Sequence, residues 1–495
     1  MQKVYMVSII LLLLGSCKSN ESDNPFLKIM DKETAANEFQ IFKNILKSSH
    51  PSLNLYVKEK RFAQIMDSLE KTISDNISFG EMFSKYNYIT NEIGCAHTYV
   101  SVSDEVYDSL LRRPYFFPLP VKLVEDKLLV NVFDWSLPEG TEIKAINGES
   151  VPKIIEKIRV CEAVEGYHRQ TQGKIAVESF ALNYFYLYGR QNKFEVRIRD
   201  TIGFEKDVSL LPVSLSEWND TYSDNIYYYD RVQCDYDFKI DEVNAFAVMR
   251  IRTFRSEGSE RQEAYKNFCK NSFELLYRKK NISSLIIDLR ENLGGDLTNS
   301  SLLFSYLAKE DFKEYEAAIS KIKEIPETNY LEKNFEIGKK ELINETLSEE
   351  FSPVLSKTFY KLVDTFIDRW KPDKYSFKGN VYIITNSKVA SAASYFSVMV
   401  KNAGVGKIVG EETSGGTYSG NGFANLQYSL PYSKIKLVFP YAHLIYSYKD
   451  KENRGHGLLP DYEIADSYQS FKNNEDRQMF YIIDSLIPQS FKYKK

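Results

Sequence analysis

Hydrophobic positions change their spacing twice along the chain. From about residue 28 to 110 they recur every three or four residues, the spacing of one face of a helix. Across 111–215, short runs alternate between apolar and polar residues, which is typical of strands. From 216 to 495, strand-length apolar runs alternate with helical patterns, which indicates parallel strands joined by helices. We therefore predict a multidomain α+β and α/β protein with boundaries near residues 110 and 215.

Two stretches interrupt the pattern of the third region. Residues 217–239 are polar and aromatic, which predicts a connecting loop or hairpin. Residues 309–373 are charged and have mostly helical spacing. We expect them to form a helical insertion over the α/β core.

The first residues show an export pattern. Residues 7–14 form an apolar run too short to span a membrane, as in a secretory signal. It ends in Leu14-Gly15-Ser16-Cys17, which resembles the lipobox of bacterial lipoproteins and implies cleavage after residue 16 and lipid on Cys17. The alternative is an ordinary signal with an incidental cysteine. We expect residues 17–27 to be a tether and the protein to be anchored to a bacterial membrane, facing the periplasm or cell surface.

Composition removes some partner classes. The chain has 64 basic and 68 acidic residues, a net charge of −4 and no basic stripe, so we expect no nucleic-acid partner. Five cysteines occur without a Cys-x-x-Cys pair. We therefore expect no metal site and no cofactor, and buried free thiols for the cysteines other than Cys17.

Ser391 stands where a strand pattern changes into a helix pattern. An apolar run over 381–384 predicts a strand, a polar turn follows, and Ser391 lies between small alanines at the start of a helix. The hydroxyl of such a serine can protrude, and the free amides of the first helical turn can receive an oxyanion. The alternative is that Ser391 only caps the helix.

A second strand-to-helix junction carries polar groups and paired glycines. The apolar run from residue 284 delivers Asp288 and Arg290 at its carboxyl end, where ligands of open α/β sheets bind. Gly294-Gly295 follows and can bring bare backbone amides against an oxyanion. We expect Asp288 and Arg290 to fix this loop as an internal ion pair.

The order of these motifs resembles the C-terminal-processing and tricorn-core serine peptidases, the tail-specific protease family. The order is Asp288-Leu-Arg-x-Asn-x-Gly-Gly295, Ala390-Ser-Ala-Ala393, Gly410-Glu-Glu-Thr-Ser-Gly-Gly416 and Gly457-Leu-Leu-Pro-Asp461. The resemblance implies a crotonase-like, ClpP-related α/β core acting on peptide bonds. The segment from Gly140 to Asn147-Gly148 resembles a PDZ-like module, which implies that 111–215 holds extended peptides, although an unrelated small β domain is the alternative.

The resemblance also implies site residues. The Ser–Lys branch has a lysine after the glycine-rich motif, and this chain has none there. The tricorn-like branch uses a histidine in a segment that reads Gly94-Cys-Ala-His97-Thr98 here, so His97 is the expected general base, with His456 as the alternative. Glu452 is the expected orienting acid. The backbone amides of Ala392 and of Gly294 or Gly295 are the expected oxyanion hole.

These expectations combine into two hypotheses. The first is an exported serine peptidase that cleaves peptide or protein substrates through a Ser391 acyl-enzyme. The second is a degenerate peptidase fold that binds peptides or apolar ligands, because the family's hydroxyl beside the histidine is Ala96 here, and the glutamate often three residues after the nucleophile is Ser394.

Overall fold

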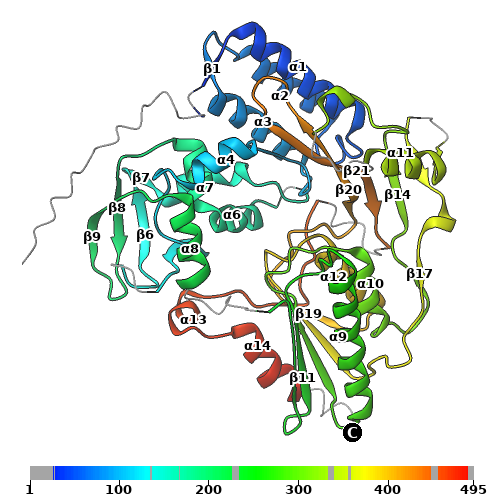
Figure 1. Ribbon diagram of the computed structural model, residues 1–495. Coiled ribbons are helices and arrows are strands. Elements are labelled where there is room, and N and C mark those ends of the chain that lie inside the picture. Colours follow the sequence, from blue (N-terminus) through cyan, green and yellow to red (C-terminus); the bar gives the residue numbers. More distant parts are fainter. Residues whose placement is uncertain are drawn as a thin grey trace, which may run out of the picture.

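The computed structural model describes residues 26, 28–133, 137–166, 168–225, 234–332, 339–354, 358–447 and 455–488. Figure 1 shows the N-terminal helices, a small β module and a larger α/β part arranged side by side. This mixed multidomain fold confirms the predicted class. Within the described residues, no helix combines the length and apolarity needed to cross a membrane.

The N-terminal region consists of helices whose apolar faces are fully buried. Phe39, Phe42, Ile45 and Leu46 of the first helix have no exposed surface, as their spacing predicts. A capping box between Ser78 and Glu81 starts α3, and Gly94, at a φ of 70°, ends it. The elements are β1 (Ile29–Met30), α1 (Lys32–Ser49), α2 (Glu59–Lys71), β2 (Ile77–Ser78), α3 (Phe79–Ile93), β3 (Tyr99–Ser101) and α4 (Asp104–Leu111).

The small β module has its own core. Its antiparallel sheet runs β4-β5-β6-β8-β9, with β7 on β6, and buries a cluster around Phe117, Phe180 and Phe194. Helices α6 and α7 lie in a region whose spacing predicted strands. The elements are β4 (Val121–Val124), β5 (Lys127–Val130), β6 (Glu142–Ile146), β7 (Glu149–Ser150), α5 (Val151–Ile158), a 3-10 helix (Arg159–Cys161), α6 (Arg169–Glu178), α7 (Phe180–Tyr188), β8 (Phe194–Arg199) and β9 (Glu205–Leu210).

The α/β part is built on a second sheet, ordered β10-β11-β12-β18-β19-β22, in which every neighbouring pair except β10–β11 is parallel. Strand β12 is buried on both faces: Leu285 and Ile287 join one hydrophobic cluster and Ile286 joins another. The elements are β10 (Tyr236–Asp241), β11 (Phe246–Ile251), α9 (Ser259–Arg278), β12 (Ser284–Asp288), α10 (Leu297–Ser305), β18 (Asn380–Thr385), α12 (Ser391–Ala403), β19 (Lys407–Gly410), β22 (Tyr462–Glu463), α13 (Tyr468–Asn473), α14 (Arg477–Tyr481) and a π-helical turn (Ile482–Leu486).

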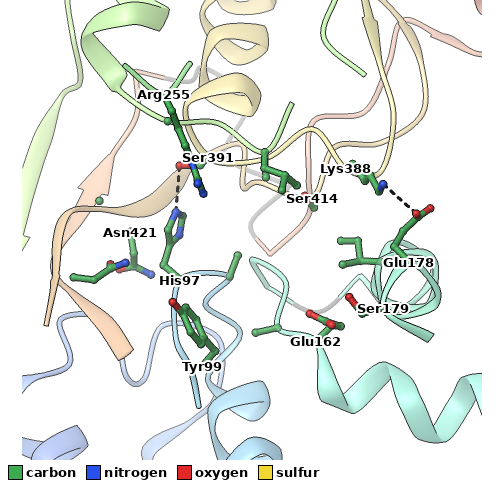
Figure 2. A pocket seen from close by; sticks show the side chains of 18 of the residues that line it. His97, Tyr99, Glu162, Glu178, Ser179, Arg255, Lys388, Ser391, Ser414 and Asn421 are labelled. Atoms are coloured by element: carbon green, nitrogen blue, oxygen red, sulfur yellow. Dashed lines mark hydrogen bonds and ion pairs between the residues drawn. The ribbon is translucent and has the colours of Figure 1, made fainter. Parts of the chain in front are cut away.

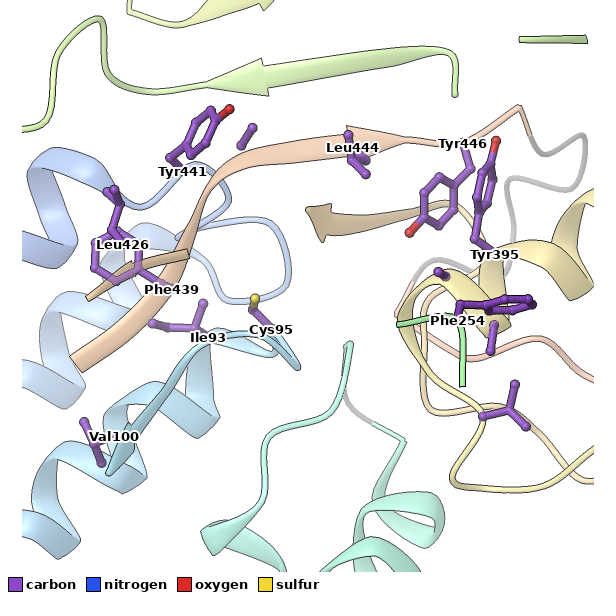
Figure 3. Close-up of a cluster of buried hydrophobic side chains, with 14 of the residues drawn as sticks. Ile93, Cys95, Val100, Phe254, Tyr395, Leu426, Phe439, Tyr441, Leu444 and Tyr446 are labelled. Carbon is purple, nitrogen blue, oxygen red and sulfur yellow. The ribbon is translucent and has the colours of Figure 1, made fainter. Parts of the chain in front are cut away.

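A third sheet joins the two ends of the chain. It runs β15-β16-β14-β21-β20, and β3 of the N-terminal region pairs with β21. Ile93, Cys95 and Val100 belong to the same hydrophobic cluster as Phe439 of β21 (Figure 3). The elements are β13 (Phe312–Lys313), β14 (Ala317–Ser320), a 3-10 helix (Thr328–Tyr330), α11 (Lys339–Glu349), β15 (Phe351–Pro353), β16 (Tyr360–Leu362), a 3-10 helix (Asp364–Phe366), β17 (Arg369–Trp370), β20 (Ser419–Ser429) and β21 (Lys436–Ile445).

Two sequence-based predictions of local structure are wrong. Within its described residues the segment 309–373 has five short strands beside the helix α11, because buried residues of β14 pair with the long strand β21. The segment 217–239 begins as helix α8 (Leu215–Asn225), whose Trp218 packs into the main core, and ends in β10. In both places tertiary packing overrides the local polar composition.

Candidate active site

Ser391 is held in a strained backbone conformation at the start of a helix. It is the first residue of α12, six positions after β18 ends, and its φ is 48°. A non-glycine residue in this region costs about 1–3 kcal/mol and persists only where its surroundings fix it. The N-cap is Ala390, without a side-chain cap bond, so the alternative that Ser391 only caps the helix does not describe this junction.

His97 reaches Ser391 from the other end of the chain. Its Nε2 lies 3.2 Å from Ser391 Oγ (Figure 2). His97 lies between α3 and β3 in the chain. Because β3 pairs with β21, the His97 side chain comes to lie beside the α/β part. Burial lowers the pKa of His97, which favours the neutral imidazole that a general base needs.

Gly294 lies directly against the serine. A Cβ on Gly294, where φ is 99°, would stand 2.6 Å from Ser391 Cβ. The Gly294 amide donates to Asn292 Oδ1 at 2.8 Å. Within the described part of the chain, the amides of Gly295 and Ala392 make no hydrogen bond. Ala392 follows Ser391 in the chain and Gly295 lines the same cleft, so these two donors are available for an oxyanion.

Asp288 and Arg290 form a buried ion pair, as expected for a structural couple. Arg290 Nη2 lies 2.8 Å from Asp288 Oδ2 and 2.7 Å from Asp476 Oδ2, and Arg252 also contacts Asp288. Burial alone would raise the pKa of Asp288, but the two guanidinium groups lower it. This network fixes the loop that carries Gly294.

The Gly410–Gly416 segment is tied to the serine helix. Ser394 Oγ lies 2.8 Å from Thr413 Oγ1 and donates to the Gly415 carbonyl at 3.0 Å. A Cβ on Gly415 would meet Ser394 Cβ at 2.6 Å and the Ser391 amide nitrogen at 3.0 Å. The residue that replaces the family's glutamate thus joins the loop to α12.

The alternative base His456 and the nearby lysine Lys388 make other contacts. Lys388 pairs with Glu178 at 3.0 Å and Glu291 at 2.5 Å, away from Ser391. His456 Nδ1 lies 3.6 Å from Glu412 Oε1. The predicted acid Glu452 and the predicted lipidation site Cys17 lie outside the described residues.

Ser391 lines a cleft of about 950 Å³. Its walls come from the N-terminal region (His97, Tyr99), the β module (Glu162, Glu178), α8 (Trp218, Tyr222) and the third sheet (Asn421, Phe423). Arg255 also lines the cleft, beside Ser391 (Figure 2). Such a volume suits a segment of polypeptide with several side chains. No pattern in the sequence indicated that α8 would form a wall of the cleft.

Three potential metal ligands lie beneath the cleft. The Cys95 Sγ, one ring nitrogen of His97 and one Glu165 oxygen all lie within 4.8 Å of one another. Ligands of tetrahedral zinc are about 3.5 Å apart, so this group would have to contract to hold the ion. The free thiols of Cys95 and Cys269 are buried, as predicted, whereas Cys161 is half-buried and Cys234 is exposed.

Known proteins resemble this chain in part of its sequence and in its fold. The profile of peptidase family S41 matches residues 245–464. Mature CPAF complexed with lactacystin has 13% identity and a TM-score of 0.67, over 93% of this chain and 99% of that one. Another structure of mature CPAF has 13% identity and a TM-score of 0.62, over 93% and 98%.

No curated protein matches the chain. The structural matches establish the fold. The family profile covers the strands and the helix around Ser391. Residues 245–464 thus resemble peptidase family S41, and this match supports a serine-type peptidase.

Proposed function

We propose that the chain hydrolyses peptide bonds through an acyl-enzyme on Ser391, with His97 as general base. The observation that supports this most is the 3.2 Å contact between His97 Nε2 and Ser391 Oγ, 294 positions apart. The strained φ of Ser391 and the cleft around it support the same assignment.

The mechanism follows from these positions. Nε2 takes the Ser391 proton as Oγ attacks the carbonyl carbon, and the resulting imidazolium returns that proton to the leaving amine. Water then attacks the acyl-enzyme with His97 as base again. The substrate is a peptide or protein segment lying in the cleft.

The proposed oxyanion hole is the pair of amides of Gly295 and Ala392. Of the two glycines considered from the sequence, Gly295 is the better donor because the Gly294 amide is already bonded to Asn292. Loss of one such donor costs about 10²–10³-fold in kcat. Glu452 stays a prediction from the sequence.

We also propose that the protein is exported and held at the cell envelope by lipid on Cys17. The support is the Leu14-Gly15-Ser16-Cys17 order after a short apolar run. Metabolic labelling with an alkyne fatty acid should mark wild-type protein but not Cys17→Ala. Equal labelling of both would refute the anchor.

A fluorophosphonate probe tests the catalytic assignment. Wild-type protein should be labelled, Ser391→Ala should not, and His97→Gln should be labelled at least 100-fold more slowly. Ser397→Ala is the matched control, because that serine lies on the same helix and bonds only to the Ala393 carbonyl. Equal labelling of wild type and Ser391→Ala, or of neither, would instead favour a fold that only binds peptides.

A further inference from the structure

The ring nitrogen of His97 that faces away from the serine needs a hydrogen-bond acceptor. Nε2 can accept the Ser391 proton only if the imidazole proton is on Nδ1. Nδ1 is buried and, among the residues that the structure describes, has no hydrogen-bond partner. A buried N–H without an acceptor costs about 1–3 kcal/mol, so the active tautomer requires an acceptor close by.

The Glu165 side chain places a carboxylate near the His97 ring. Its side chain is 1% exposed, and one of its oxygens lies within 4.8 Å of a ring nitrogen of His97. Its Oε2 accepts a hydrogen bond from the Ala96 amide at 3.3 Å, and its Oε1 accepts one from Tyr56 Oη at 3.2 Å. The carboxylate thus holds the backbone next to His97.

The backbone around Glu165 is tightly packed. The Gly166 amide donates to the Gly94 carbonyl at 2.8 Å. A Cβ on Gly166, where φ is 84°, would stand 2.1 Å from the Gly455 carbonyl oxygen. Three loops that are distant in sequence therefore meet at Glu165, and they fix it below His97.

We propose that Glu165 is the positioning residue that sets the tautomer of His97. The ionised carboxylate accepts the Nδ1–H, either after a small rotation of the side chain or through one bridging water. The lone pair of Nε2 then faces Ser391. This inference rests on the proposed function for its catalytic consequence, but the proximity of Glu165 to the His97 ring is independent of that function.

Protonation of Glu165 would reverse the tautomer. A neutral carboxyl group donates to Nδ1, so the imidazole proton moves to Nε2, which can no longer take the Ser391 proton. Passing from this state to the active one releases one proton to solvent. Burial raises the pKa of Glu165 to about 8, so the change falls in an accessible pH range.

The other titratable groups around Glu165 keep one charge state through this range. Burial raises the pKa values of Tyr56, Cys95 and Tyr446, which therefore stay neutral at pH 8. Burial also lowers the pKa of His168, whose Nε2 contacts the Glu165 carbonyl and whose Nδ1 lies 3.8 Å from Glu412. An ionisation near pH 8 thus belongs to the pair of Glu165 and His97.

The rate of fluorophosphonate labelling between pH 6 and 10 tests the proposal. Wild-type protein should show a rise with an apparent pKa near 8, and Glu165→Gln should lack this rise and react about 100-fold more slowly at pH 9. Glu314→Gln is the matched control, because Glu314 is another buried acid with a raised pKa, bonded away from His97. It should keep the rise, as should Glu452→Gln. A rise that persists in Glu165→Gln, or that disappears in Glu452→Gln, would overturn the proposal.

Nitrogen NMR of ¹⁵N-histidine-labelled protein separates this proposal from the catalytic one. The His97 signals should change from the Nε2–H to the Nδ1–H tautomer near pH 8 in wild type and stay constant in Glu165→Gln. A tautomer change without Ser391 labelling would uphold the role of Glu165 and refute the proposed peptidase mechanism. The same tautomer at all pH values in wild type would refute the role of Glu165.

Discussion

At the scale of single residues, the site depends on glycines, which leave space because they have no side chain, as much as on its reactive side chains. Gly294 leaves room for the Ser391 side chain, and Gly415 leaves room for Ser394 and the Ser391 amide. The sequence predicted Ser391 and His97 because each lies in a recognisable motif. It gave no comparable signal for Glu165, which stands in an irregular loop and acquires its neighbours only when three distant segments meet.

Substitution of Gly294 should distinguish the effect of backbone strain from the effect of a clash with Ser391. In Gly294→Ala the new methyl group would overlap Ser391 Cβ, so we expect labelling of Ser391 to fall at least 100-fold. Gly148→Ala is the control: its φ of 82° imposes a similar strain, about 1–3 kcal/mol, but no atom lies within 4 Å of the new methyl. Labelling rates and thermal melts of both variants check this, and similar labelling losses in the two would contradict it.

At the scale of elements, the parallel sheet was predictable and the third sheet was not. The apolar runs of β12 and β18 are buried on both faces and read directly as strands. The strands of 309–373 are short, and β14 among them pairs with β21, which lies about 120 residues further along the chain. Local spacing contains no information about such a partner, so the strands of this segment were not predicted.

The contacts that join α12 to the Gly410–Gly416 loop lead to a prediction at the scale of elements. Ser394→Ala removes the hydrogen bonds to Thr413 Oγ1 and the Gly415 carbonyl, which then keep only their bond to each other and the bond from the Leu458 amide to Thr413. We expect the free energy of unfolding to fall by about 1–3 kcal/mol. Ser397→Ala removes only a bond within the same helix and should cost less. Urea denaturation measures both, and a larger loss for Ser397→Ala would contradict the proposed joint.

At the scale of the whole molecule, the site exists because the N-terminal region is part of the same folded body as the α/β part. Strand β3 pairs with β21, and Glu38 of α1 accepts hydrogen bonds from the amides of Tyr432 and Ser433. His50 lies at the same junction: its Nε2 contacts Thr98 Oγ1 at 2.7 Å, and its ring centroid lies 5.5 Å from that of Phe439, with the two rings tilted. Separation of these regions would therefore remove His97 from Ser391.

The buried His50 should make this junction acid-sensitive. Burial, the neighbouring His443 and Lys321 lower the pKa of His50 to about 3, whereas an unfolded histidine titrates near 6.5. Below pH 6.5 the unfolded chain binds the extra proton, so stability falls with pH, by about 2–3 kcal/mol at pH 4.5 from this group. His50→Gln should reduce the pH dependence of the unfolding free energy between pH 7 and 4.5. An equal pH dependence in wild type and His50→Gln would show that other groups control the junction.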